Sequence, residues 1–222
     1  MSSQPHVTRV SRSKQEARNS YDTMSALYDI MASSEQKYNE MGVQQLTLTE
    51  GEDVLEIGFG TGQCLLSIVQ LVGHTGVVCG IDISEGMSRR AQRKIQEAGL
   101  SQEMLLTIGD AAHLPFHSGQ FDAILMTFTL ELFDTPEIPV VLHECSRVLK
   151  SEGRMCVVGL SKKNAGIAVT VYEWIHRLIP KYVDCRPIFI EKSLQNAGFT
   201  IIDTIHLTMW GLPVEIVLAQ NP

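Results

Sequence analysis

The amino-acid sequence predicts a doubly wound α/β domain, in which helices cover both faces of a mostly parallel sheet. Short aliphatic segments bounded by glycine or aspartate recur along the chain, as buried strands do. They span residues 53–57, 77–82, 104–108, 121–127 and 153–159. Segments with the periodicity of amphipathic helices lie between them, at residues 62–72, 85–98 and 137–150. Because strand-helix-strand crossovers are right-handed, this alternation predicts a parallel sheet with helices on both faces.

Both ends of the chain depart from this alternation. Apolar residues at helical spacing within residues 21–50 predict one or two short helices, which we expect to form an N-terminal lid. Two further helices are expected at residues 165–179 and 188–197. The segments FTIIDTIHLTM and VEIVLA, separated by WGLP, then predict a terminal hairpin of two strands.

The composition favours a globular domain and disfavours nucleic-acid binding. Of the 222 residues, 44% are hydrophobic and 19% are charged, as in chains that fold around a core. The formal charge of -7 and the isoelectric point near 5.5 disagree with the basic surface that nucleic acids require. Residues 1–20 are the exception, since they carry four basic residues and one acidic residue. We expect a flexible, solvated tail here, with peripheral contact to an anionic membrane as the alternative.

The cysteines and the apolar runs predict a cytoplasmic protein. The five cysteines are well separated and contain no CxxC pair, which favours reduced thiols over a disulfide framework or a zinc site. No apolar run reaches the roughly 18 to 20 residues that a membrane span needs. The first residues lack the apolar segment of a secretory signal. We therefore expect a soluble chain without a transmembrane segment.

Three glycines within five positions mark a sharp turn after the first predicted strand. The pattern is Glu56-x-Gly58-x-Gly60-x-Gly62. Ligands of open α/β sheets bind at the carboxyl ends of strands, and glycines let a ligand approach the backbone closely. The dinucleotide fingerprint GxGxxG requires a glycine where Gln63 stands, which disfavours an NAD-dependent oxidoreductase. The loop instead favours a ligand that places no phosphate at this turn.

Acidic residues follow the next two predicted strands. Asp82 ends the second strand, where a carboxylate can accept hydrogen bonds from both hydroxyls of an unphosphorylated ribose. Asp110 and Ala111 follow the third strand, where they can bind the amine and the ring of a purine. Each feature also recurs for purely structural reasons. Their order along the chain, each at a strand's carboxyl end, predicts a nucleoside site.

Five motifs carry a resemblance to a known family. The segments VLEIGFGTG, GIDIS, GDAAHLPF, FDAILMTFTLE and HECSRVLKSEGRM resemble the S-adenosylmethionine-dependent class I methyltransferases, and most of all the branch of ubiquinone/menaquinone-biosynthesis C-methyltransferases. The resemblance extends from residue 21 to about residue 160 and is loose beyond it. It implies a sheet of order 3-2-1-4-5-7-6 whose last strand is antiparallel. The sequence departs from the family at Ser151 and Glu152, where Pro-Gly is usual, in a turn far from the cofactor.

The resemblance also implies a cofactor, S-adenosylmethionine, and the residues that bind it. These are Glu56, Gly58, Phe59, Gly60, Gly62, Asp82, Ile83, Met87, Asp110, Ala111, Thr127 and, from the lid, Tyr28. The glycine loop would line the methionine end of the cofactor, and Asp82 would bind the ribose. Ile83 and Met87 would flank the adenine. The backbone near Thr127 would meet the ammonium group.

No catalytic residue can be assigned from the sequence, and no metal site is expected. The sulfonium of the cofactor is a strong methyl donor, so orienting the acceptor can supply about 7 to 11 kcal/mol of the rate enhancement. A carbon or phenol acceptor also gains from a base, for which the two Tyr-Asp pairs of YDTMSALYD are candidates, with packing of the lid as the alternative. None of the seven histidines shows the spacing of metal ligands.

The acceptor is expected to bind between the lid and residues 160–190. The expected contacts are Tyr21, Phe128, Glu131 and Trp174. These residues and the apolar face of the helix predicted at 165–179 favour a small hydrophobic or amphipathic acceptor, such as a quinol. Methylation of a lipid amine or another metabolite at nitrogen, oxygen or sulfur is an alternative, and a non-catalytic binding module is another. In this interpretation a tail (1–20) precedes one domain (21–222), which comprises the lid (21–50), the cofactor-binding core (51–160) and the substrate-side elements (161–222).

Overall fold

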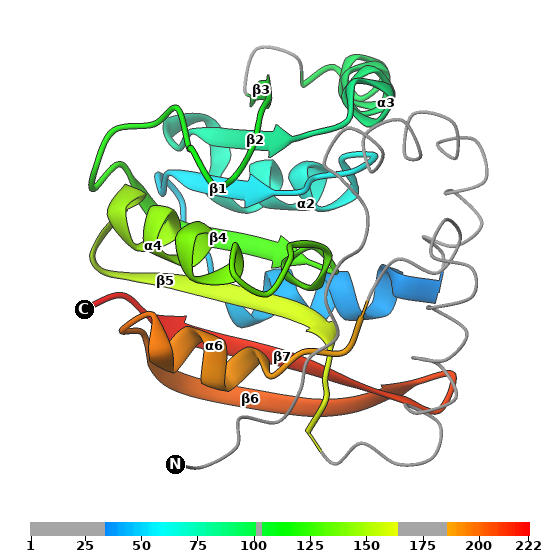
Figure 1. The fold of residues 1–222 in the computed structure, drawn as a ribbon. Coiled ribbons are helices and arrows are strands. Elements are labelled where there is room, and N and C mark those ends of the chain that lie inside the picture. The colour runs from blue at the N-terminus through cyan, green and yellow to red at the C-terminus, as the bar shows by residue number, and fades with distance from the viewer. Residues whose placement is uncertain (1–33, 101–103, 164–185) are drawn as a thin grey trace, which may run out of the picture.

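The computed structural model of the chain describes residues 34–100, 104–163 and 186–222. These residues form one sheet of seven strands in the order β3-β2-β1-β4-β5-β7-β6 (Figure 1). The strands are β1 (Val54–Ile57), β2 (Val78–Asp82), β3 (Met104–Ile108), β4 (Phe121–Thr127), β5 (Leu149–Leu160), β6 (Thr200–Met209) and β7 (Leu212–Gln220). Neighbours from β3 to β5 are parallel, and β7 runs antiparallel to β5 and β6. The predicted fold class and strand order are confirmed.

Helices cover both faces of the sheet because its central strands are apolar on both sides. α2 (Gln63–Val72), α3 (Glu85–Glu97) and a helix over residues 34–45 pack against one face, and α4 (Ile138–Val148) and α6 (Ile190–Asn196) pack against the other. The short 3-10 helices η1 (Gly73–Thr75) and η2 (Leu130–Leu132) follow α2 and β4. Val54 and Leu55 are both fully buried but belong to opposite cores, as neighbouring strand residues do.

The fifth strand is longer than the sequence pattern predicts. The periodicity of residues 137–150 predicts a helix up to residue 150, but β5 already begins at Leu149. Leu149 pairs with Phe121 on β4, and the register of this pairing then shifts. Glu152 lies in the shifted stretch, with a φ of +59°. The Ser-Glu sequence that replaces the family's Pro-Gly therefore falls in a bulge at the start of β5.

The helix over residues 34–45 lies flat on β4 and β5, so this part of the expected lid belongs to the core. Its Gly42 lets the sheet approach, because an added Cβ would lie 2.6 Å from Cγ2 of Val158. Val43, in the same helix, is 4% exposed and packs into the core of this face. The rest of the expected lid, residues 21–33, and the helix expected at 165–179 lie outside the described residues.

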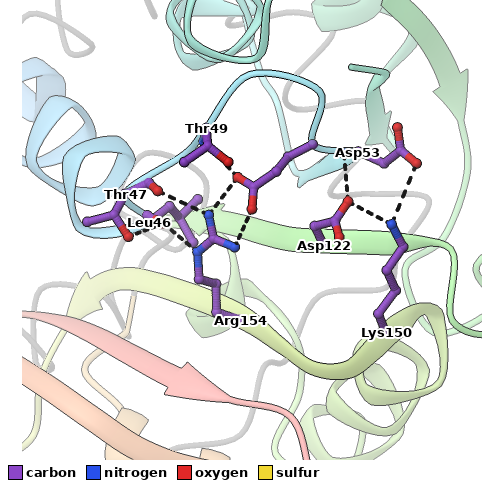
Figure 2. Close-up of polar contacts among 8 residues, drawn as sticks. Leu46, Thr47, Thr49, Asp53, Asp122, Lys150 and Arg154 are labelled. Atoms are coloured by element: carbon purple, nitrogen blue, oxygen red, sulfur yellow. Dashed lines mark hydrogen bonds and ion pairs between the residues drawn. The ribbon is translucent and has the colours of Figure 1, made fainter. Parts of the chain in front are cut away.

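Charged residues at the amino ends of β1, β4 and β5 form a group of polar contacts (Figure 2). Through one of them, Arg154, the chain that follows this helix is bound to the sheet. Arg154 on β5 donates through Nε to the carbonyl of Leu46. Its Nη1 and Nη2 donate to the carboxylate of Glu52 at 2.8 and 2.7 Å. Lys150 binds Asp122 at 2.8 Å nearby. Because ligands of such sheets bind at the opposite, carboxyl ends of the strands, these contacts serve the fold.

β6 and β7 form the predicted hairpin with a tighter turn than expected. Met209 pairs with Leu212, so Trp210 and Gly211 alone form the turn. Their φ values are +52° and +81°. A two-residue turn with positive φ at both positions matches the twist of antiparallel strands. Pro213, which the sequence pattern places in the turn, belongs to β7.

The cysteines within the described residues are buried and free, as expected of packing residues. Cys64 and Cys156 belong to the core on one face of the sheet, and Cys79 and Cys145 belong to the core on the other. Within the same described ranges, no helix has both the length and the hydropathy that crossing a bilayer requires.

Candidate functional site

The three glycines of the loop after β1 have backbone conformations that other residues rarely adopt. Gly58, Gly60 and Gly62 have φ values of +74°, +51° and +78°. Space is limiting as well, because a Cβ added to Gly58 would lie 2.2 Å from Oγ1 of Thr129. Gly62 caps α2, and a Cβ there would lie 3.0 Å from the Cβ of Ala91. Backbone conformation and packing therefore both require glycine in this loop.

Asp82 joins the glycine loop to the start of α3. Its Oδ2 accepts a hydrogen bond of 2.9 Å from the N–H of Gly60, and its Oδ1 accepts one of 2.8 Å from the N–H of Ser84. Ser84 in turn caps α3 by accepting from the N–H of Met87. Ile83 is half-buried and Met87 is 2% exposed. A carboxylate has about four acceptor positions, so Asp82 can bind hydroxyls beside these two backbone groups.

The end of β3 belongs to the same group of hydrogen-bonded turns. The N–H of Gly109 donates to the carbonyl of Asp82 at 2.9 Å. The carboxylate of Asp110 accepts from the N–H of Ala112 at 3.0 Å, in a turn that buries Ala111. The structure therefore brings together the carboxyl ends of β1, β2 and β3, which carry the acidic residues that the sequence predicts to form one site.

Glu56, on β1, is a buried carboxylate with a free acceptor. It is 1% exposed, and among the described residues its Oε2 has no hydrogen-bond partner. Burial raises its pKa to about 8 and the charge of Asp82 adds to the rise, against hydrogen bonds from Cys64 and the Leu65 backbone. A buried carboxyl oxygen without a donor is costly. The ammonium group of S-adenosylmethionine would supply that donor, so Glu56 fits the methionine end of this cofactor.

The chain leaves β4 through a strained aromatic residue. Phe128 has a φ of +46°, which is rare for a bulky side chain and typical of functional sites. Its N–H donates to the carbonyl of Val158 at 2.7 Å. The hydroxyl of Thr129 donates to the carbonyl of Thr127 at 2.8 Å. The ring of Phe128 meets that of Tyr38 edge to face, with 6.3 Å between the centroids. Tyr38 therefore lies beside the expected acceptor contacts, which the helical periodicity of its segment alone did not indicate.

Glu131 follows Phe128 after the same strand, within η2, and two charged residues that the sequence analysis missed act on it. Burial raises its pKa to about 8, and the nearby Glu35 and Arg186 shift that pKa upward and downward respectively. Arg186 is fully buried and donates to the hydroxyl of Thr135 at 3.1 Å. Neither residue belongs to a motif. Glu35 stands in an amphipathic helix, and Arg186 is a single basic residue outside any periodic segment.

Several expected contacts remain outside this group. The side chain of Phe59 is 3% exposed and packs over Gly80, where an added Cβ would lie 2.7 Å from its Cδ1. Phe59 therefore offers only its backbone to a ligand of the loop. Tyr21, Tyr28 and Trp174 lie outside the described residues. Among the residues that are described, no group of three or more His, Cys, Asp or Glu side chains could hold a metal ion.

Comparison with known proteins confirms the resemblance that the motifs indicate. Residues 54–153 match a family described as "Methyltransferase domain". Demethylmenaquinone methyltransferase from Lactobacillus johnsonii is 30% identical over 162 residues, which are 73% of this chain and 65% of the relative. Nocamycin O-methyltransferase from Saccharothrix syringae is 31% identical over 142 residues, which are 63% of this chain and 49% of the relative. The chain thus spans between about half and two-thirds of the length of these relatives.

Solved structures share the fold over a larger part of the chain. The cyclase SpnF has a TM-score of 0.78 and 20% identity, over 95% of this chain and 97% of that one. A SAM-dependent methyltransferase from Aquifex aeolicus has a TM-score of 0.64 and 21% identity, over 83% of this chain and 89% of that one. Because both identities are low, these likenesses establish the fold alone.

Proposed function

We propose that this chain, whose residues 54–153 belong to the methyltransferase-domain family, transfers the methyl group of S-adenosylmethionine to a small hydrophobic or amphipathic acceptor such as a quinol. One observation carries the proposal. Glu56, Asp82 and Asp110 come from three neighbouring strands, whose ends are tied together by hydrogen bonds from Gly60 and Gly109. A nucleoside with an amino-acid end requires such a set of acceptors.

Each of these residues has a proposed task. Asp82 binds the two ribose hydroxyls through its carboxylate oxygens. Asp110 and the N–H of Ala111 bind the purine edge, between Ile83 and Met87. Glu56 binds the ammonium group through Oε2, which has no other hydrogen-bond partner within the described residues. The backbone near Thr127, with Tyr28 of the lid, completes the proposed cofactor site.

The bound cofactor supplies an activated methyl group, so the chain's own residues must orient the acceptor and exclude water. We place the acceptor beside Phe128 and Glu131, at the carboxyl ends of β4 and β5, with Tyr21 and Trp174 as further contacts. Phe128 is 5% exposed and is held by its neighbours in a strained conformation, which limits its movement. A rigid apolar wall of this kind favours an apolar acceptor.

The relatives support the class of acceptor more than the acceptor atom. One is named for demethylmenaquinone and another for O-methylation of nocamycin. Quinols present both a ring carbon and phenolic oxygens, so they are the first class to test. Methylation of a lipid amine or another metabolite at nitrogen, oxygen or sulfur is the alternative. A cyclase shares the fold, so cofactor binding and methyl transfer must be measured separately.

The test combines calorimetry with a transfer assay. S-adenosylhomocysteine is titrated into the full chain, and transfer from methyl-labelled S-adenosylmethionine is followed with 1,4-naphthohydroquinone, phosphatidylethanolamine and a thiol. We expect binding, and transfer to the quinol. Transfer to the amine or the thiol alone supports the alternative, and binding without transfer supports a binding module. An absence of binding contradicts the proposal. Glu97→Gln, on the exposed face of α3, is the control for loss of a charge.

A further inference from the structure

Glu131 is fully buried at the carboxyl ends of β4 and β5, and only one of its two carboxyl oxygens accepts a hydrogen bond from another described residue. It follows β4 within η2 and is 0% exposed. Its Oε1 accepts a hydrogen bond of 3.1 Å from the N–H of Leu160. The last residue of β4 that pairs with β5 is Thr127, whose partner is Val158. Leu160 lies two residues beyond Val158, so no β4 carbonyl accepts the hydrogen bond from its N–H. Oε1 therefore replaces the missing strand partner.

The other oxygen of Glu131 has no such role. Within the described residues, Oε2 has no hydrogen-bond partner. It lies against the backbone of Gly159, where an added Cβ would lie 2.6 Å from it. The φ of Gly159 is not positive, so space and not backbone conformation favours glycine here. The absence of a side chain at Gly159 therefore leaves room for Oε2 of Glu131, which accepts no hydrogen bond from the described residues.

Two charged groups on other elements act electrostatically on Glu131. Glu35, in the helix over residues 34–45, raises the pKa of Glu131, and Arg186, before α6, lowers it. Burial, the largest cause, raises this pKa to about 8 and raises that of Glu35 to about 7. The negative charge of Glu35 therefore works in the same direction as burial and disfavours the ionised form of Glu131.

We infer that Glu131 is the base of the reaction, whose Oε2 takes up the proton that the acceptor loses as it gains a methyl group. The inference rests on the proposed function. In the exchange, the acceptor's bond to hydrogen would break and its electron pair would stay on the acceptor, which would form the new bond to the methyl carbon. The bond between that carbon and the cofactor's sulfur would break, and its electron pair would stay on the sulfur. The proton passes to Oε2 of Glu131. Glu35 is a positioning residue, because its negative charge raises the proton affinity of Glu131 and so strengthens it as a base.

The decisive variant is Glu131→Gln. Its side-chain carbonyl can still accept from Leu160, so the structural role is kept, but it cannot take up a proton. With 1,4-naphthohydroquinone we expect kcat to fall by at least about 100-fold, the usual size of base catalysis, while S-adenosylhomocysteine binding and the melting temperature stay unchanged. Glu35→Gln removes a like charge, so the rising limb of the kcat–pH profile shifts to lower pH. Wild-type kcat and an unchanged profile in Glu131→Gln overturn the inference.

A second readout needs no turnover. Carbon-13 NMR of the chain labelled at the glutamate carboxyl groups follows each titration directly. We expect a resonance that titrates near neutral pH, is lost in Glu131→Gln and shifts to lower pH in Glu35→Gln. A Glu131 that titrates like an exposed glutamate overturns the inference, even if a variant folds poorly. A chain that methylates no acceptor contradicts the proposed function, whereas an active Glu131→Gln contradicts only the role of Glu131.

Discussion

The N–H of Gly60 donates a hydrogen bond of 2.9 Å to Oδ2 of Asp82. This bond joins the loop after β1 to the end of β2, so Asp82 both shapes the proposed cofactor site and binds within it. The two roles can be separated by substitution, because asparagine keeps one acceptor oxygen and alanine keeps none.

Asp82→Ala should weaken the binding of S-adenosylhomocysteine by about 1 to 3 kcal/mol, as loss of hydrogen bonds to a charged group does. It should also lower the free energy of unfolding without ligand, because the N–H groups of Gly60 and Ser84 lose their acceptor. Asp82→Asn should lie between Asp82→Ala and wild type in both measurements. Calorimetry and urea unfolding test this pair, and unchanged affinity in Asp82→Ala refutes the ribose assignment.

Gly58→Ala should destabilise the fold more than the same change at Gly99. Both glycines have a positive φ, of +74° and +75°, so alanine meets a similar backbone cost of about 1 to 2 kcal/mol at each. Only at Gly58 does the new Cβ meet Thr129, at 2.2 Å from its Oγ1, whereas no described atom lies within 4 Å at Gly99. Crowding of this kind adds about 1 to 3 kcal/mol. Equal free energies of unfolding in the two variants would contradict the tight packing of the loop.

The positions that the sequence predicted well are those where the strand pattern and a motif agree. Asp82 and Asp110 end aliphatic segments, and parallel strands place their carboxyl ends at one edge, so their proximity follows from the fold class. Glu35 and Arg186 could not be found this way. Their proximity to Glu131 depends on how a helix and a loop pack across the sheet, and neither residue breaks a pattern in its own segment.

The errors at element ends have a similar cause. The helical pattern of residues 137–150 continues into β5, because the apolar Leu149 suits either a helix or a strand. Pairing with Phe121 on β4 decides in favour of the strand, and no local signal in the sequence reports that pairing. In the hairpin, Pro213 suggested a longer turn, but a proline close to a strand's start is tolerated.

Glu152→Gly should stabilise the protein. The φ of Glu152 is +59°, a conformation that costs an ordinary residue about 1 to 2 kcal/mol and costs glycine almost nothing. Glycine also loses more entropy on folding, so we expect a net gain of about 0.5 to 1 kcal/mol. Ser151→Gly is the matched control, because Ser151 has no positive φ and should only lose stability. Thermal unfolding of the two variants tests this, and a loss in both excludes strain at Glu152.

Stability should fall in acid because of the charged cluster at the amino ends of the strands. Burial alone would raise the pKa of Glu52, but hydrogen bonds from Arg154 and from the Thr49 backbone outweigh it and lower the pKa below 4.5. Since the folded pKa is lowered, this stabilisation is present above pH 4.5 and is lost as the pH falls through the folded value. Urea unfolding between pH 3 and 7 should show a weaker pH dependence in Glu52→Gln. An identical dependence would show that the ion pair of Glu52 with Arg154, drawn in Figure 2, adds no net stability.

Glu56 should make the free energy of unfolding fall as the pH rises, which is the opposite of the effect of Glu52. The same ionisation of Glu56 should strengthen cofactor binding. Burial raises its pKa from 4.5 to about 8, so its contribution to stability is fully present below pH 4.5 and is lost as the pH rises toward 8. Glu56→Gln, which cannot ionise, should flatten the decline in unfolding free energy between pH 5 and 8, and the exposed Glu97→Gln should not. If ionised Glu56 binds the ammonium group, the affinity for S-adenosylhomocysteine should rise over the same range in wild type and stay flat in Glu56→Gln. A variant that keeps the wild-type rise would exclude Glu56 as the partner of that group.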